Sequence, residues 1–166
     1  GELVLEPYRI LEYDDVKVGF VGITTPESIS KTSHISFVNE LGGVDYDFDG
    51  DATGEKLVAS VQEAVNGAKK EGADYIIAVG HNGEHVDYER WSSLYIVEHT
   101  NGIDAFIDGH SHEETPYLMQ KNKEGKEIPI TQSGTKLHNI GKVTIGKNGK
   151  IKTELIDSKK ITSKDD

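Results

Sequence analysis

Cysteine is absent from this chain of 166 residues, which excludes disulfide bridges and metal sites held by thiolates. Any metal would therefore be bound by histidine, carboxylate, amide or carbonyl groups. Long apolar runs are absent as well, because no stretch approaches the ~20 residues that a membrane-spanning helix needs. We recognise no signal peptide in the sequence, and its start at Gly1-Glu2 leaves room for a targeting segment further upstream.

Positive charge is in short supply, with 18 Lys and Arg against 29 Asp and Glu and a formal net charge of −11. Proteins that bind nucleic acid polymers or anionic membranes need clustered Lys and Arg, so we expect neither as a partner. An acidic protein can still bind a phosphate locally where a metal ion supplies the positive charge. The length suits one domain, and 35% hydrophobic residues permit a lean core.

Two short apolar runs, Tyr75–Val79 and Ile103–Ile107, organise the middle of the chain. Each is rich in β-branched and aromatic residues and is followed by Gly or Asp-Gly and then His, a pattern typical of buried strands in a parallel or mixed sheet. In an open α/β sheet, ligands bind at the carboxyl ends of the strands. We therefore expect His81 from the first strand, and His110 and His112 from the second, to meet at a metal site.

The surrounding pattern predicts an α/β chain. Apolar residues at helical spacing predict one helix from Leu57 to Lys70 and a second over Tyr88–His99. A helix–strand–helix–strand order implies a parallel pair of strands with a right-handed crossover. The other expected elements are an edge strand over 2–12, a buried strand over 16–25, a short helix capped by Thr25, hairpin strands over 117–120 and 128–132, and a C-terminal antiparallel hairpin over 141–145 and 151–156.

A calcium site is one interpretation of the acidic segment 44–56, because its first half has the alternating carboxylates of an EF-hand loop. The twelfth position holds a lysine where that loop requires a bidentate glutamate, so we favour a solvated strand. In such a strand Tyr46 and Phe48 face inward, and Asp51 or Thr53 caps the helix that follows.

Neutral imidazole is the commonest metal ligand in proteins, and a set of three suits Zn, Mn or Fe. His-x-His alone is a weak motif, whereas His-x-His and Gly-His-Asn-Gly at two strand ends of one α/β unit are far more specific. The neighbouring Glu84, His85 and Glu113 either orient the imidazoles or are solvated. Four histidines are expected to be structural or solvated, namely His34, His85, His99 and His138.

Four segments together resemble the calcineurin-like metallophosphoesterase family, and most closely its branch of 5′-nucleotidases, UDP-sugar hydrolases and 2′,3′-cyclic nucleotide phosphodiesterases. The resemblance covers roughly residues 7–156, and the two histidine motifs in series are its most specific part. The four segments are VKVGFVGITTPES, ADYIIAVGHNGE, GIDAFIDGHSHE and ITQSGTKLHNIGKVTI.

The resemblance implies part of a four-layer α/β/β/α sandwich and a site for two divalent metals about 3.5–4 Å apart. By position, His81 and His110 match ligands of one metal, and His112 matches a ligand of the other. In such enzymes the metals activate a bridging water, which attacks the phosphorus of a nucleotide or a related phosphoester. Asp108 stands where the family often has glycine, a departure that removes no ligand.

The family's opening motifs supply the bridging carboxylate, an asparagine ligand and the histidine that assists the leaving group. In the family they precede the strand that corresponds to residues 16–25, and no counterpart precedes it here. The resemblance therefore places the catalytic residues N-terminal to Gly1. We expect residues 1–157 to be the C-terminal half of a catalytic domain, residues 158–166 to be a polar tail or linker, and the isolated chain to be inactive.

Half of such a sandwich should expose an apolar face, which predicts pairing with the missing N-terminal half or with a second copy of the chain. The resemblance further implies an extracellular, periplasmic or cell-wall-associated protein. The alternative hypothesis is a non-catalytic metal-binding or solute-binding module that reuses this half of the fold.

Overall fold

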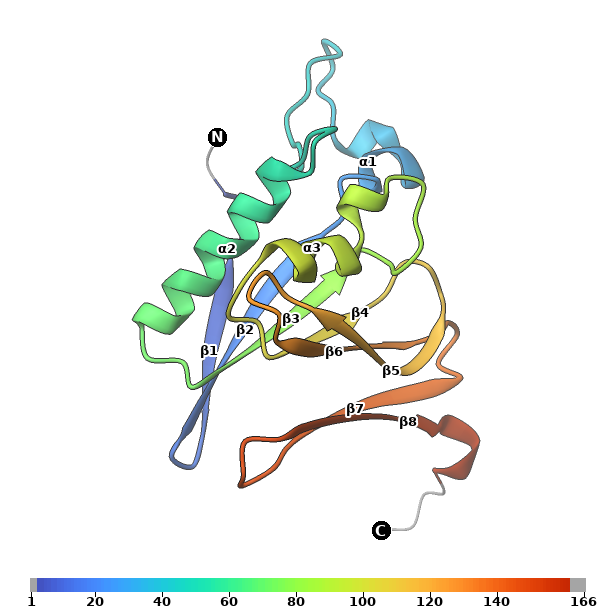
Figure 1. The fold of residues 1–166 in the computed structure, drawn as a ribbon. Helices are drawn as coiled ribbons and strands as arrows, with labels where there is room; N and C mark the ends of the chain where they lie inside the picture. The colour runs from blue at the N-terminus through green and yellow to red at the C-terminus, as the bar shows by residue number, and fades with distance from the viewer. Residues whose placement is uncertain (1–2, 162–166) are drawn as a thin grey trace.

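The computed structural model describes residues 3–161, which form a six-stranded sheet and a separate two-stranded hairpin (Figure 1). The spatial order of the large sheet is β1-β2-β3-β4-β6-β5, and β7 pairs with β8. The strands are β1 Tyr8–Tyr13, β2 Val16–Thr24, β3 Tyr75–His81, β4 Ala105–Asp108, β5 Glu114–Lys121, β6 Glu127–Ser133, β7 Asn139–Ile145 and β8 Ile151–Asp157. The α-helices are α1 Ser28–Lys31, α2 Glu55–Lys70 and α3 Ser93–His99.

The sheet is mixed. Strands β2, β3, β4 and β6 run parallel to one another, whereas β1 and β5 pair antiparallel at the two edges. The register places Thr24 beside His81 and Asp108 beside Gln132. Four strands therefore end at one edge of the sheet, and the segments that follow them are brought together there.

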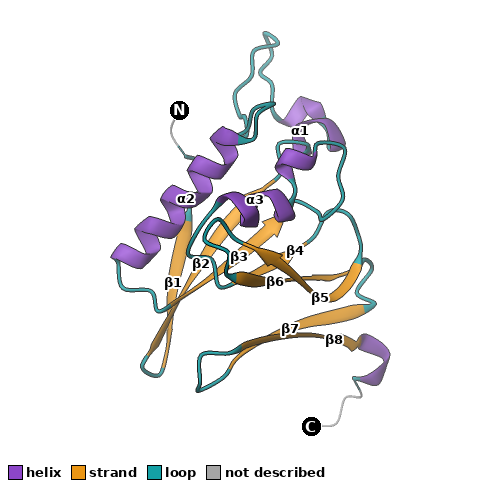
Figure 2. Cartoon of the chain, in the orientation of Figure 1, coloured by secondary structure: helices purple, strands orange, loops and turns teal. Residues whose placement is uncertain are grey.

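One face of the sheet is covered by α2 and α3 (Figure 2). Helix α2 buries one stripe because its apolar residues recur three and four positions apart. That stripe packs on the strand residues that point to the same side, and together they form the larger core cluster. Its fully buried members include Val21, Val65, Ile76, Ala78, Ile96 and Phe106.

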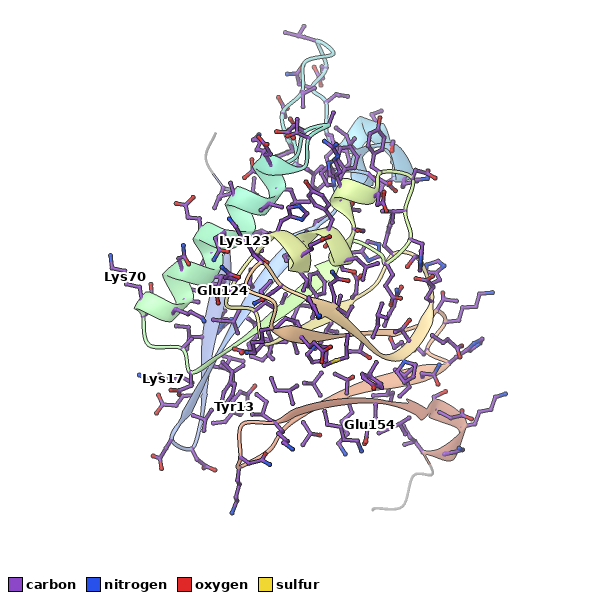
Figure 3. The ribbon with its side chains drawn as sticks, in the orientation of Figure 1. Tyr13, Lys17, Lys70, Lys123, Glu124 and Glu154 are labelled. Atoms are coloured by element: carbon purple, nitrogen blue, oxygen red, sulfur yellow. The ribbon has the colours of Figure 1, made fainter. Side chains whose placement is uncertain are left out.

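The opposite face of the sheet carries the alternate residues of the same strands, among them Val18, Phe20 and Ile77. The β7–β8 hairpin covers this face in part (Figure 1). A cleft of about 740 Å³ remains between hairpin and sheet, and Figure 3 shows the labelled Tyr13 between the β1–β2 end of the sheet and the hairpin. Val79, in the middle of the sheet, is 42% exposed on this side.

The predicted α/β class, mixed sheet and C-terminal antiparallel hairpin are confirmed. The expected edge strand is β1, and β3 and β4 form the expected parallel pair. The second helix is shorter than predicted, because a 3₁₀ turn over Glu89–Trp91 precedes α3. Ser92 separates the two, since its hydroxyl accepts a hydrogen bond from the backbone N–H of Tyr95 at 3.1 Å and caps α3.

The predicted cap of the first helix was wrong. Glu27, not Thr25, occupies the cap position of α1, because Thr25 still continues the line of β2 and donates its backbone N–H to the carbonyl of His81. The predicted tail starts with a 3₁₀ turn at Ser158–Lys160, where the Asp157 carboxylate accepts the Lys159 N–H. Residues 162–166 lie outside the described part, so the tail stays a prediction.

The acidic segment is not a strand apart from a single bridge between Val38 and Val44. Tyr46 is 53% exposed, whereas Phe48 packs against Phe37 with ring centroids 5.4 Å apart. Gly54, in a left-handed conformation, holds the cap position of α2.

Between residues 3 and 161, no helix is both long and apolar enough to cross a membrane.

Candidate metal centre

His81 and His110 meet at the carboxyl edge of the sheet. His81 is the last residue of β3, and His110 follows the end of the neighbouring β4 by two residues. Their ring centroids lie 5.0 Å apart with the rings at 70°. The His110 side chain is 14% exposed, while His81 and His112 are exposed at the edge. The parallel register thus brings together two of the three predicted ligands.

The turn after β4 has an unusual backbone. His110 and His112 have φ values of 87° and 60°, in the left-handed region that costs a non-glycine residue about 1–3 kcal/mol. A side chain at Gly109 would place its Cβ 3.1 Å from Nδ1 of His81. The chain therefore turns tightly against His81, and the strain is concentrated at two of the residues that the sequence singles out.

Asp108 joins the two histidine turns. Its Oδ1 accepts hydrogen bonds from the backbone N–H groups of Asn82, Gly83 and Gly109 at 3.0, 3.1 and 2.8 Å. The side chain is buried, and its Oδ2 has no hydrogen-bond partner among residues 3–161. One carboxylate thereby fixes the backbone after His81 relative to the backbone before His110.

Glu27 reaches the same site from the loop after β2. Its Oε2 lies 3.0 Å from Nε2 of His110, and its Oε1 accepts the backbone N–H of Tyr88 at 3.2 Å. Glu27 is 4% exposed. The pair is thus a nearly buried contact between a carboxylate and an imidazole, made across 83 residues of sequence.

The electrostatics of the edge favour a neutral His81. Partial burial lowers the pKa of His81 below its ordinary value, and the neighbouring His110 and His112 lower it further, while the Asp108 carboxylate acts in the opposite direction. A neutral imidazole is the form that binds metals. The lowered pKa of His81 therefore favours the form that a metal ligand needs.

Glu84, His85 and Glu113 form a second cluster beside this pair, and their potential ligand atoms all lie within 4.8 Å of one another. Nδ1 of His85 contacts Glu113 at 2.7 Å. The Ser111 hydroxyl donates to Glu113 at 2.9 Å and accepts from Gln132 at 3.0 Å. Burial, the main cause, raises the pKa of Glu84, and the Glu113 carboxylate adds to the rise.

The other histidines differ in their surroundings. His99 stacks on Tyr95 with ring centroids 3.9 Å apart, and its Nδ1 lies 2.9 Å from the Tyr95 carbonyl oxygen. His138 is exposed, with Nδ1 3.9 Å from Glu114. Both therefore have the structural or solvated roles expected of them. The side chain of His34 lies outside the described part of the chain.

The donor set fits a divalent metal in kind, because it pairs imidazoles with nearby carboxylates. The ligand atoms of His81, His110 and His112 do not all lie close enough together to form one site. Within the described range, the only group of three or more histidines and carboxylates whose ligand atoms all lie within 4.8 Å of one another is Glu84, His85 and Glu113. The role of Glu27 and the structural role of Asp108 were not predicted from the sequence. Their only signal was position, directly after strands that end at the same edge.

Comparison with known proteins identifies relatives of the chain. It is 33% identical over 147 residues to a 5′-nucleotidase of Vibrio cholerae, a match that covers 81% of this chain and 25% of the relative. The chain thus spans about a quarter of the length of that relative. No family model matches the chain.

Solved structures share the fold. A sulfate thiohydrolase, SoxB, of Thermus thermophilus superposes with a TM-score of 0.68 at 22% identity, covering 95% of this chain and 26% of that one. An NAD nucleotidase of Haemophilus influenzae superposes with a TM-score of 0.65 at 21% identity, covering 90% of this chain and 26% of that one. The same architecture therefore occurs as one part of larger hydrolases.

Proposed function

We propose that this chain, which belongs to the 5′-nucleotidase family and matches only a part of its members, is the metal-binding half of a phosphoesterase catalytic domain. The proposed half domain comprises residues 1–157, with residues 158–166 as a tail or linker. The observation that carries the proposal is the meeting of His81 and His110, whose rings lie 5.0 Å apart at the ends of two parallel strands.

His81 and His110 bind one divalent metal in this proposal, and His112 binds a second. Zn, Mn and Fe all accept imidazole ligands. When bound, such metals supply Lewis-acid activation of water and polarisation of phosphoryl oxygens. The chain itself contributes the ligand positions, because Asp108 holds the turns after β3 and β4 together.

The substrate class we propose is a nucleotide or a related small phosphoester. The net charge of −11 does not oppose this, because bound metals invert the local charge at the carboxyl edge. The bridging carboxylate and the residue that assists the leaving group come from outside this chain. The isolated chain should therefore bind metal weakly and show negligible hydrolysis.

We assign the missing partner to the open face of the sheet. Its cleft of about 740 Å³ is lined by Val18, Phe20, Ile77 and Ile107 of the sheet and by Val143 and Ile145 of the hairpin. An apolar face of this kind is unstable in water unless it is covered. Because the relative is about four times as long as the matched part, the occupant we propose is the remainder of the parent domain.

The parent protein tests the catalytic proposal. Expressed whole, it should release phosphate from a nucleoside monophosphate, and H81A or H110A should lower the rate by at least about 10²-fold, the scale of losing one electrostatic group in an active site. H138A is the matched control, because His138 lies outside the histidine pair. Elemental analysis of the same samples should show metal lost in H81A and H110A only.

Two results would contradict the proposal. Full activity of H81A and H110A in the parent protein would remove the histidine pair from the site. Metal bound by the parent without any phosphate release would favour the alternative, a non-catalytic binding module.

A stable dimer of the isolated chain would assign the open face to a second copy. An extracellular, periplasmic or wall-associated location belongs to the proposal and is tested by fractionating cells that express the parent.

A further inference from the structure

Glu27 lies in the short connection between β2 and α1, Thr25-Pro26-Glu27, which the proposed function does not use. The loop is tied to the metal centre by its backbone, because the Thr25 N–H donates to the carbonyl of His81 at 3.2 Å. The Thr25 hydroxyl in turn accepts the Glu27 N–H at 3.3 Å. Thr25 is fully buried, so the position of Glu27 is set from β3 as well as from β2.

Both oxygens of the Glu27 carboxylate are engaged. One accepts the Tyr88 N–H at 3.2 Å, and the other lies 3.0 Å from Nε2 of His110. Tyr88 is itself held by stacking on Trp91, with ring centroids 4.4 Å apart. Since the side chains of Glu27 and His110 are only 5% and 14% exposed, water competes poorly for this contact.

The chemistry of the pair selects one tautomer. A neutral imidazole has one N–H donor and one lone pair, whereas an ionised carboxylate only accepts hydrogen bonds. Nε2 of His110 must therefore carry the hydrogen that it gives to Glu27, and the lone pair is left on Nδ1. Metal-bound histidines are commonly oriented in this way by a carboxylate on the second nitrogen.

We propose that Glu27 is a positioning residue that holds His110 in the Nε2–H tautomer, so that His110 offers only Nδ1 to a metal. The inference rests on the proposed function in one respect, that His110 is a metal ligand. Its first step concerns the metal-free chain alone. The left-handed backbone of His110, with φ of 87°, and the Glu27 contact then set the direction of the ring together.

Nitrogen NMR of the chain labelled with ¹⁵N-histidine tests the tautomer directly. At alkaline pH, once the imidazole is neutral, we expect His110 to show a protonated Nε2 and an unprotonated Nδ1. In E27Q the amide cannot accept hydrogen bonds from both Tyr88 and His110. When its oxygen faces Tyr88, its NH₂ faces Nε2, so the population should shift toward the Nδ1–H tautomer.

Metal affinity gives the second readout. In the parent protein, E27Q should weaken Zn²⁺ or Mn²⁺ binding by about 10–100-fold, the range typical of carboxylates that orient a ligand. E89Q is the matched control, because Glu89 is an exposed carboxylate in the neighbouring turn. It should change neither the tautomer nor the affinity. The folded state of each variant is checked by its thermal unfolding.

The outcomes separate the two proposals. A Nδ1–H tautomer in the wild-type chain, or an E27Q variant with unchanged tautomer and affinity, would overturn the role of Glu27. With ¹¹³Cd as the probe, coupling to Nε2 of His110 would overturn it too, because the metal would then occupy the nitrogen that Glu27 is proposed to keep protonated. The expected tautomer without any metal binding by the parent would instead refute His110 as a ligand, and with it the proposed function.

Discussion

The two faces of the six-stranded sheet differ in how completely the chain covers them. On the helical face, Phe106 and Ile76 are fully buried beneath α2 and α3. On the other face, Phe20 and Ile107 are only partly buried against the β7–β8 hairpin, and Val79 is 42% exposed. The same strands supply both faces, because alternate residues point to opposite sides.

The difference indicates which face of the sheet is buried by residues of this chain alone. The helical face gains its burial within the chain and should dominate the stability of the isolated protein. The open face has apolar side chains where a solvated sheet would have polar ones, which is the pattern of a surface that is covered in a larger molecule. The candidate metal centre lies at the carboxyl edge of the sheet, which both faces share.

The largest expected effect comes from the helical face. F106A should lower the free energy of unfolding of the isolated chain by about 3–5 kcal/mol, because a buried phenyl ring is lost and a cavity remains. F20A is the matched comparison on the open face and should cost less than half as much. Chemical denaturation followed by circular dichroism measures both. Equal losses for the two variants would show that the open face is as well packed as the helical one.

The next largest loss of stability is expected at the carboxyl edge of the sheet, where Asp108 ends β4. D108A should cost about 2–4 kcal/mol, because it leaves three N–H groups, two of them buried, without an acceptor. D108N keeps an acceptor oxygen and should stay within about 1 kcal/mol of the wild type. The same denaturation experiment compares them. If D108N is as destabilised as D108A, the negative charge, rather than the hydrogen bonds to Asn82, Gly83 and Gly109, holds the turns together.

A charge on the open face should affect association more than stability. F20K places an ammonium group in the cleft, where its long side chain can reach water, so the isolated chain should lose about 1 kcal/mol or less. Covering the face would bury that charge, and the remainder of the parent domain should then no longer bind. Light scattering of the co-expressed halves measures the complex. Unchanged complex formation by F20K would place the partner elsewhere.

The smallest effect is a pH dependence at Glu84. Burial, chiefly, raises its pKa above the ordinary 4.5, so the folded state holds this proton more tightly than the unfolded chain. The free energy of unfolding should therefore fall as the pH rises from about 4.5 through the raised value. E84Q should flatten this fall, whereas E98Q, at an exposed position on α3, should not. Thermal unfolding across the pH range provides the comparison.

Much of the fold could be predicted from local pattern. The runs before His81 and His110 form the expected parallel strands, and the spacing of Leu57, Val61 and Val65 gives α2 its buried stripe. Alternation and helical periodicity are properties of neighbouring residues, so they can be seen without the fold. The meeting of His81 and His110 followed from the rule that parallel strands end at one edge.

Other features depend on segments that are distant in the sequence. Glu27 meets His110 across 83 residues, and Asp108 accepts hydrogen bonds from a turn 26 residues away. The inward position predicted for Tyr46 was wrong, because the acidic segment pairs only through the single bridge between Val38 and Val44, which is too short to impose alternation. In each case the contact or exposure of the side chain depended on which distant segment of the backbone packs next to it. A pattern of neighbouring residues does not contain that information.

The sequence by itself determined the α/β class, the two histidine-bearing strand ends and the family to which the chain is related. Only the tertiary structure decided that the two sheet faces are unequally covered and that two buried carboxylates organise the histidine turns. The physical reason is that periodicity selects which side chains are buried, whereas contacts between a buried polar group and its partner are selected by packing. A carboxylate in a sequence has no visible partner until the strands that flank it are aligned.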